Sequence, residues 1–404
     1  MQGPDLFSRP RGGRRGAALS LVFASILLAG AAGGSWDVAG EAGASDRRPL
    51  SNDEPAGADS PRDLVAAAEE AVNEGLADGK SGAEAAQAAE EVVSRSGDRW
   101  ATVYDADEYE EFRKALDGEY TGVGLWAKRS ADGCVEVARV RSGGPADKAG
   151  IRPGDRILAI DGKDVGDLPV TEVLARLRGE SATGSGTVGA GSSVVLGLRR
   201  DGRTWTETLR RARIDTESVT VDRDSDGVTH ITVARFTTGS GEKVRRAVRS
   251  APEGRGVLLD LRGNSGGLVT EAVVAASAFL DGGLVATYDM RGEQRALYAE
   301  GEGDTQRPLV TLVDGGTMSA AELLTGALQD RGRSVVVGSR TFGKGSVQMP
   351  TELPDGSVAE LTVGHYRTPA GRTVDGVGIT PDLPVDSRAE ERARTVLSGL
   401  GTPS

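Results

Sequence analysis

The alternation of strand-like and helix-like segments after residue 216 constrains the fold of this chain most strongly. Short apolar runs that suit buried strands recur there, at 230–236, 256–263, 284–290, 308–315 and 334–339. Helical patterns at 241–249, 267–280 and 319–330 separate several of these runs. Strands and helices that alternate in this way predict an α/β core with a largely parallel sheet. We expect this core to span residues 216–390, followed by a C-terminal helix or tail at 391–404.

Length and composition narrow the possible functions. A chain of 404 residues is expected to form two or three domains. Its net charge of −12, with no basic run after residue 15, argues against a nucleic-acid partner. The only cysteine, Cys134, cannot form a disulfide within the chain, and two histidines are too few for a multi-histidine zinc site. We therefore predict no metal site and no cofactor.

The N-terminal residues resemble an export signal. Four arginines between residues 9 and 15 precede sixteen uncharged residues at 17–32. A positive flank before such an apolar run predicts that residues 1–33 form a signal peptide or a short membrane anchor. The rest of the chain is then expected to be extracytoplasmic, either secreted or anchored to the cytoplasmic membrane. Residues 34–60 carry almost no large apolar side chain and are expected to be a disordered linker.

Two further regions precede the α/β core. Serine caps and a capping box predict an N-terminal helical segment at 61–118, with helices at about 61–76, 82–93 and 107–116. Residues 119–215 instead contain short β-type runs, at 135–140, 156–161 and 193–200. One helical pattern at 169–179 and a glycine-rich loop at 181–191 interrupt these runs.

The string GNSGG at 263–267 raises the possibility of a trypsin-like nucleophile at Ser265. That mechanism needs an upstream histidine base on a double β-barrel. The only upstream histidine, His230, lies in an apparent strand, and about fifty residues cannot hold two barrels. The alternative is a loop between a buried strand and a helix, where main-chain N–H groups stabilise negative charge.

Ser319 and Lys344 are stronger candidates for chemistry. Ser319 follows a strand and a Gly-Gly turn at the start of a helix, where α/β folds place reactive groups, although it could simply cap that helix. Lys344 lies between two glycines after another apolar strand. A desolvated, neutral lysine can act as the base for a serine without any histidine. Gln348 could accept a hydrogen bond from that amine if the chain bends near Gly345.

These residues resemble the signature of the carboxyl-terminal processing proteases, also called tail-specific proteases. The resemblance rests on SAAE at 319–322, VVVGSRTFGKGSVQ at 335–348, VLLDLRGNSGG at 257–267 and RTPAGRTVDGVGITPD at 367–382. Upstream, YTGVG at 120–124 and GGPADKAGIRPGDRILAIDGK at 143–163 look like a PDZ domain. The family usually has proline at the position of Ser265, and its serine motif usually carries further serines near Ser319.

The resemblance implies a fold and a set of roles. The fold is an α/β protease core of crotonase- and ClpP-like ββα elements, with an inserted PDZ domain and an N-terminal helical segment. Ser319 would be the nucleophile, Lys344 the general base and Gln348 the residue that orients the lysine. The main-chain N–H groups of Gly266 and Ala320 would form the oxyanion hole.

In the PDZ segment, a terminal carboxylate would bind at the loop formed by Tyr120, Thr121, Gly122, Val123, Gly124 and Leu125. A packing module without a ligand is the alternative for this segment. The expected function is that of an exported serine endopeptidase that cleaves proteins or peptides with apolar C-terminal tails. The protein could form a homo-oligomer, and we expect it to have no nucleic-acid partner. The rival interpretation is a catalytically inactive, membrane-tethered adaptor that binds protein C-termini.

Overall fold

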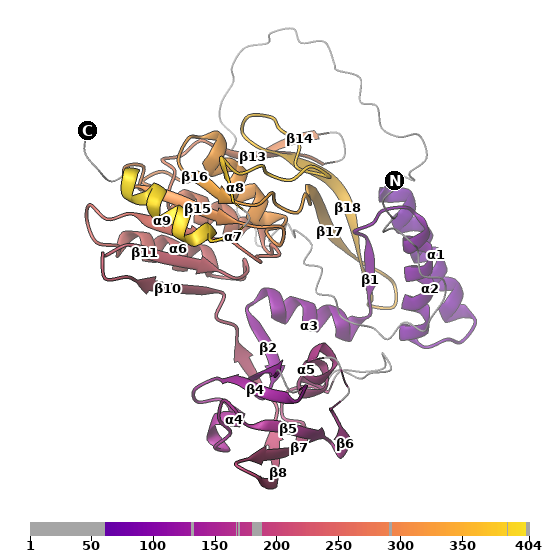
Figure 1. The fold of residues 1–404 in the computed structure, drawn as a ribbon. Helices are drawn as coiled ribbons and strands as arrows, with labels where there is room; N and C mark the ends of the chain where they lie inside the picture. The colour runs from indigo at the N-terminus through magenta and orange to yellow at the C-terminus, as the bar shows by residue number, and fades with distance from the viewer. Residues whose placement is uncertain are drawn as a thin grey trace, which may run out of the picture. The chain divides into compact units, whose positions relative to one another are not determined.

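The computed structural model of the chain describes residues 61–400, except 131–132, 167, 169, 180–187, 291–292 and 386 (Figure 1). The predicted signal or anchor at 1–33, the linker at 34–60 and most of the glycine-rich loop lie outside the described residues. Contacts divide the chain into two compact units. One unit is Glu110–Thr216, and the other joins the described residues before Glu110 to those from Glu217 onward. The division falls within helix α3 (Ala106–Leu116).

The larger unit is built on a six-stranded sheet whose core is parallel, as the sequence predicts. The strand order is β10-β11-β12-β15-β16-β19, and only the β10–β11 pair is antiparallel. The strands are β10 (Val219–Arg223), β11 (Thr229–Val233), β12 (Val257–Asp260), β15 (Leu309–Val313), β16 (Val335–Gly338) and β19 (Leu383–Pro384). The helices that separate or follow them are α6 (Ser240–Arg249), α7 (Val269–Ser277), α8 (Ala320–Asp330) and α9 (Ala389–Leu400).

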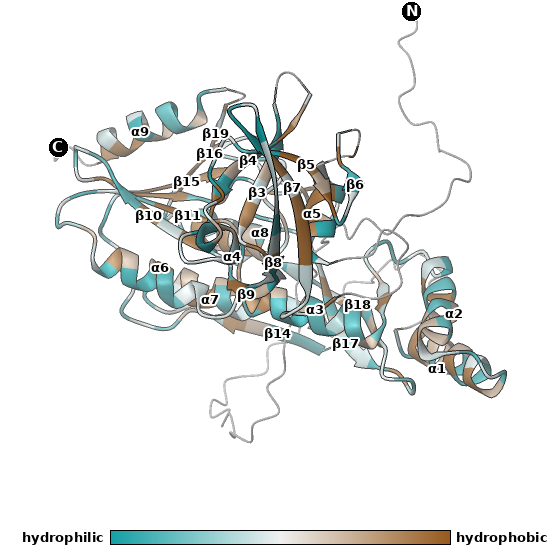
Figure 2. Cartoon of the chain, turned by 90° about the horizontal axis from the view of Figure 1, so that it is seen from below, coloured by the Kyte–Doolittle hydropathy of each residue, from teal (hydrophilic) through white to brown (hydrophobic). Residues whose placement is uncertain are grey.

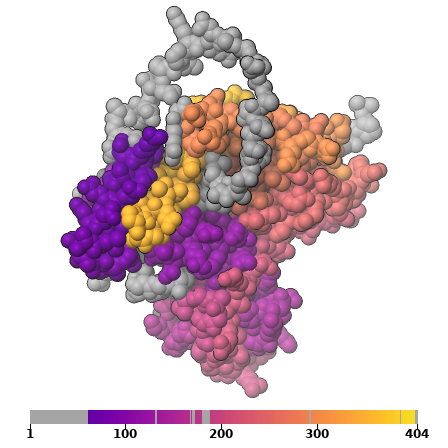
Figure 3. Space-filling model, turned by 180° about the vertical axis from the view of Figure 1, so that it is seen from behind, coloured from indigo at the N-terminus to yellow at the C-terminus, as the bar shows by residue number. Residues whose placement is uncertain are grey.

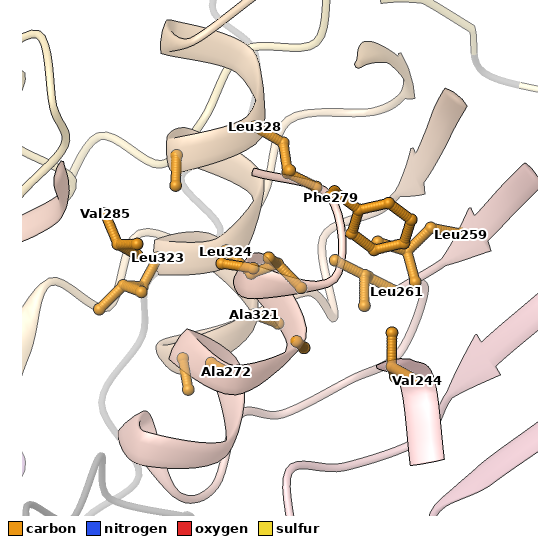
Figure 4. Packing of buried hydrophobic residues seen from close by; sticks show 14 of the residues in the cluster. Val244, Leu259, Leu261, Ala272, Phe279, Val285, Ala321, Leu323, Leu324 and Leu328 are labelled. Carbon is orange, nitrogen blue, oxygen red and sulfur yellow. The ribbon is translucent and has the colours of Figure 1, made fainter. Parts of the chain in front are cut away.

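Alternate residues of these strands face two hydrophobic cores. Leu259 and Leu309 pack with residues of α6, α7 and α8, whereas Leu258 and Val310 pack with residues of α9. Because side chains alternate along a strand, α9 covers the opposite face of the sheet from the other three helices. In Figure 4, Leu324 of α8 lies on the side of Leu261 and Leu328 lies beside Phe279, whereas Leu323 lies beside Val285. Hydrophobic and hydrophilic residues alternate along α6 and α9 in Figure 2, as expected for helices with one buried side.

A second, antiparallel sheet in this unit was not predicted from the sequence. It contains β1 (Thr102–Tyr104), β13 (Leu284–Met290), β14 (Glu293–Tyr298), β17 (Ser346–Glu352) and β18 (Val358–Arg367). β18 pairs with β1, β13 and β17. The helices α1 (Pro61–Ala77) and α2 (Gly82–Arg95) share a hydrophobic core with β18 residues Ala359 and Leu361. Figure 3 shows these helices, in indigo, against the surface of the β17–β18 region, in yellow-orange.

The smaller unit has its own hydrophobic core. It contains the sheet β3-β4-β5-β7-β8, to which β6 pairs through β5, and a separate β2–β9 pair. The strands are β2 (Glu119–Gly122), β3 (Leu125–Arg129), β4 (Val135–Val140), β5 (Arg156–Ile160), β6 (Lys163–Asp164), β7 (Ser193–Arg200), β8 (Arg203–Arg210) and β9 (Ala212–Asp215). Its helices are α4 (Pro145–Lys148) and α5 (Val170–Arg178). The predicted strands at 135–140 and 193–200 and the helix at 169–179 are confirmed.

Among the helices within the described part of the chain, none combines the length and the apolar composition that a membrane span requires.

Candidate active site

Ser319 lies on a sharp turn between β15 and α8. Its φ of 59° and ψ of −118° are unusual for a residue with a side chain, and such strain is characteristic of functional turns. The residue is fully buried, and its Oγ makes no hydrogen bond to any described residue. Its carbonyl oxygen accepts a hydrogen bond of 3.0 Å from the Tyr366 hydroxyl. The turn therefore holds the backbone of Ser319 and leaves its hydroxyl oxygen without a partner in the described part of the molecule.

Glu322 is a candidate functional residue to which the sequence analysis assigned no role. Its buried carboxylate accepts main-chain N–H groups of Ser319 at 2.9 Å, Gly343 at 2.7 Å and Lys344 at 2.8 Å, and the Thr341 hydroxyl at 2.5 Å. Burial raises the pKa of Glu322, while these hydrogen bonds act in the opposite direction. One carboxylate thus joins the Ser319 turn to the Lys344 loop. The sequence did contain a signal for Glu322, because an acid three residues after a serine that starts a helix is a capping-box pattern.

Lys344 is buried as completely as Ser319, which is rare for lysine. Burial lowers the pKa of Lys344 to about 8, although Glu360 and Asp98 raise it again in part. Its Nζ lies 4.6 Å from the centroid of the Trp100 ring. A side chain at the neighbouring Gly345 would place its Cβ 2.5 Å from the main-chain nitrogen of Asp375. The glycine that follows the lysine therefore permits close approach of two backbones, as its sequence context suggested.

Gln348 lies in β17 directly after an irregularity in the β17–β18 register, between Val347 and Gln348. Its Nε2 donates to Ser346 Oγ at 2.9 Å and to Thr362 Oγ1 at 3.1 Å. The Thr362 hydroxyl donates its hydrogen to Asp98 at 3.0 Å. It can therefore only accept a hydrogen bond from Gln348, which identifies the Gln348 atom that faces it as the amide nitrogen. Gln348 Oε1 is thereby oriented away from Thr362; it is buried and accepts no hydrogen bond from the described residues.

Gly266 and Ala320 both lie beside Ser319. A Cβ added to Gly266 would be 2.9 Å from the Ser319 Cβ and 3.3 Å from the Ala320 nitrogen. Gly266 has a φ of 98°, and its N–H donates to the Asn264 side-chain oxygen at 2.8 Å. An oxyanion role for Gly266 therefore requires its N–H to exchange acceptors. Ala320 is the first residue of α8, a position where the N–H has no acceptor within the helix.

Each of the two histidines lies near an aspartate outside the GNSGG string. His230 Nε2 is 3.4 Å from Asp260 Oδ2, and His365 Nε2 is 3.8 Å from Asp375 Oδ2. Ser265 is half-buried between Asn264 and Gly266, and among the described residues the charged partners of the two histidines are Asp260 and Asp375. This arrangement offers no Ser-His pair for a trypsin-like mechanism. In the described ranges, no group of three or more His, Cys, Asp or Glu side chains could hold a metal ion.

In the smaller unit, the predicted carboxylate loop connects β2 to β3. Tyr120, Thr121 and Gly122 pair with Ile214, Arg213 and Ala212 of β9. The carbonyl oxygens of Val123 and Gly124 accept main-chain N–H groups from Ala146 and Arg141. Leu125 is buried in the core of the unit. The loop is therefore held on both sides by backbone hydrogen bonds.

The arrangement around Ser319 and Lys344 can support acyl transfer. A serine on a strained turn needs a base, and a lysine whose pKa is close to neutral can be that base. The hydrogen bond from Ser319 Oγ to Lys344 is not formed in this structure. Such bonds are often long in the absence of substrate and tighten when it binds.

Comparison with known proteins gives two family matches. The model of peptidase family S41 matches residues 227–385, and that of the PDZ domain matches residues 136–183. The S41 match therefore covers the Ser319 turn, the Lys344 loop and Gln348, and the PDZ match lies within the smaller unit.

Individual relatives are similar over most of the chain. The carboxyl-terminal-processing protease of Synechocystis sp. is 34% identical over 309 residues, 74% of this chain and 70% of its own. The carboxy-terminal processing protease of Bacillus subtilis is 30% identical over 297 residues, 72% of this chain and 62% of its own. Among solved structures, the photosystem II D1 C-terminal processing protease is 30% identical, with 79% of this chain and 86% of that chain covered and a TM-score of 0.49.

Proposed function

The chain belongs to peptidase family S41 as a C-terminal processing serine protease with a PDZ domain, and from this premise we propose that Ser319, Lys344 and Gln348 perform its peptide-bond cleavage. The observation that carries the assignment is the shared carboxylate of Glu322. It binds the backbone of both Ser319 and Lys344 and so fixes one relative to the other. The desolvated lysine supplies a base that can act without a histidine.

The proposed reaction begins with transfer of the Ser319 hydroxyl proton to Lys344 Nζ. Ser319 Oγ attacks the peptide carbonyl carbon, and the oxyanion that forms is stabilised at the start of α8, where Ala320 offers its N–H. Lys344 then gives the proton to the departing amine, which leaves an ester on Ser319. Water, deprotonated by Lys344, hydrolyses that ester and releases the new C-terminus. Gln348 Oε1 accepts a hydrogen bond from Nζ and orients the lysine lone pair.

Cleavage of an unstructured protein by four forms of the chain tests this assignment. We expect Ser319→Ala and Lys344→Ala to abolish cleavage and Ser265→Ala to retain it. Activity that survives Ser319→Ala would refute the nucleophile. Loss of activity in Ser265→Ala alone would instead support a trypsin-like mechanism.

We also propose that the smaller unit selects substrates by their terminal carboxylate at the loop of Tyr120–Leu125, with an apolar tail added as a strand. Amidation of the substrate's C-terminus is then expected to slow cleavage by raising KM. A Ser319→Ala chain should bind the free-acid peptide more tightly than the amide. Equal binding of both peptides would refute carboxylate capture.

Export of the protein remains a proposal that rests on residues 1–33. The arginines at 9–15 and the apolar run at 17–32 support an extracytoplasmic location, secreted or anchored to the cytoplasmic membrane. Cell fractionation should recover the full chain with membranes or in the extracytoplasmic fraction. Deletion of residues 1–33 should move it to the cytoplasmic fraction, and an unchanged distribution would refute the proposal.

A further inference from the structure

Glu360 is a buried carboxyl group that the proposed mechanism does not use. It lies in β18 with no exposed surface, and neither of its carboxyl oxygens accepts a hydrogen bond from a described residue. An ionised carboxylate in such a position costs several kcal/mol unless a positive charge compensates it. A group of this kind therefore requires a specific neighbour.

The sheet places Glu360 between the two segments that surround Lys344. In the strand register Glu360 lies opposite Thr102 of β1 and opposite Pro350 of β17. Trp100, two residues before Thr102, lies with its ring 4.6 Å from Lys344 Nζ. Gln348, two residues before Pro350, contacts Thr362, which shares the sheet face of Glu360 because side chains alternate along the strand.

The electrostatic influences on Glu360 indicate that its neighbour is Lys344. Burial raises the pKa of Glu360 to about 7, and the charge of Lys344 opposes this rise. For Lys344, the charge of Glu360 is the largest influence that raises its pKa, ahead of Asp98 and Asp375, while Arg99 lowers it. Glu360 also contributes to raising the pKa of Tyr104 on β1, after burial. Lys344 is thus the cation whose charge favours the ionised form of Glu360.

We propose that Glu360 is a positioning residue that acts through Lys344, its negative charge stabilising the lysine ammonium in the resting site and after each proton transfer from Ser319. This inference rests on the base role proposed for Lys344. When the proton leaves Ser319 Oγ for Nζ, the new ammonium forms beside a negative charge. When the ammonium gives the proton to the departing amine, the lysine becomes neutral again. Because the pKa of Glu360, about 7, lies below that of Lys344, about 8, Glu360 is ionised where Lys344 titrates, and its negative charge makes the lysine a stronger base.

Replacement of Glu360 should change the pKa of Lys344, and with it the pH dependence of kcat, in a defined direction. Glu360→Gln keeps the size of the side chain and removes its charge, so the pKa of Lys344 should fall. Activity requires neutral lysine, so the acidic limb of the kcat profile should move to lower pH by about one unit. The plateau of kcat above that limb should fall several-fold because a weaker base removes the Ser319 proton less readily. KM should stay unchanged, since Glu360 has no exposed surface for a substrate to bind.

Cleavage of an unstructured protein such as casein between pH 6 and pH 10 tests this inference. The set is the unmodified chain, Glu360→Gln, Glu360→Asp and Glu352→Gln. Glu360→Asp restores the charge and should return the limb toward its original pH. Glu352→Gln removes an exposed carboxylate of the adjacent strand β17 and should leave the profile unchanged. An acidic limb of Glu360→Gln that stays in place or moves to higher pH would overturn the proposal.

A second measurement does not depend on turnover. In chains carrying Ser319→Ala, the Lys344 ammonium can be titrated by NMR with isotope-labelled lysine, with Lys344→Arg identifying the signal. We expect Glu360→Gln to lower the titration midpoint by about one pH unit. An unchanged midpoint, with Ser319 and Lys344 still essential for cleavage, contradicts only the role of Glu360. Cleavage that persists without Ser319 or Lys344 contradicts the proposed function instead.

Discussion

Glu322 is the single residue on which the geometry of the site depends most. Four donors converge on its carboxylate, three of them main-chain N–H groups of Ser319, Gly343 and Lys344. In Glu322→Gln, one oxygen becomes an NH₂ group that faces donors. We expect the free energy of unfolding to fall by about 3 kcal/mol because buried donors lose their acceptor. We also expect kcat to fall about 100-fold or more, because the serine and lysine lose their common support.

Urea unfolding and casein cleavage check this prediction. Glu253→Gln, which changes an exposed glutamate in a surface turn, is the matched control and should alter neither quantity. A Glu322→Gln chain that keeps full activity and stability would show that the carboxylate is dispensable.

Asp260 provides a prediction about pH. Burial raises its pKa, but the side chains of Arg262 and His230 outweigh burial and bring the pKa of Asp260 down to about 2. A pKa that is lower in the folded state than in the unfolded state stabilises the fold above about pH 4. The pKa difference corresponds to about 2 kcal/mol, and this stabilisation is lost as the pH falls from about 4 to about 2.

The comparison for this prediction is Asp260→Asn against the unmodified chain. At pH 7 the variant should be the less stable of the two in urea, and the difference should shrink as the pH is lowered through that range. Asp226→Asn, at an exposed loop position, should keep a constant difference. A gap between Asp260→Asn and the unmodified chain that does not change with pH would contradict the assignment.

At the scale of elements, the sequence predicted the strands of the parallel sheet, which have strong local signals. It did not predict the second sheet, in which pairing with other strands decides the structure. Every residue of β12 and β15 is buried, because helices cover both faces of the sheet, and such strands appear in the sequence as continuous apolar runs. β17 contains the polar residues Ser346 and Gln348, which interrupt an apolar pattern, and they pair with His365 and Thr362 of β18. The bend that Gln348 needs was expected near Gly345. The structure has its register shift between Val347 and Gln348.

Helix α9 provides a test of the packing at this scale. Leu397 is buried against the sheet beside Leu258 and Val337, whereas Leu400, one turn later, is about half exposed. Leu397→Ala removes buried methyl groups and should lower the free energy of unfolding by about 2–4 kcal/mol. Leu400→Ala, with the same change in composition, should lower it by less than about 0.5 kcal/mol. Equal effects in urea unfolding would show that α9 does not cover the sheet.

At the scale of the whole molecule, the two units have separate hydrophobic cores. Leu196 belongs to the core of Glu110–Thr216, and Leu259 belongs to the core of the larger unit. We expect differential scanning calorimetry to resolve two unfolding transitions. Leu196→Ala should lower one of them by more than about 5 °C and Leu259→Ala the other. A single transition that both variants shift equally would show that the units unfold together.

The sequence by itself determined the α/β class of the core, the strands and helices of its parallel sheet, the resemblance to a protease family and the candidate nucleophile and base. These features depend on local patterns: apolar runs, helix starts and glycines near reactive side chains. Only the tertiary structure decided that Glu322 joins Ser319 to Lys344, that a second sheet forms around β18, and that Glu360 lies between Thr102 and Pro350. These contacts join segments far apart in the chain, and long-range pairing depends on packing that no local pattern encodes.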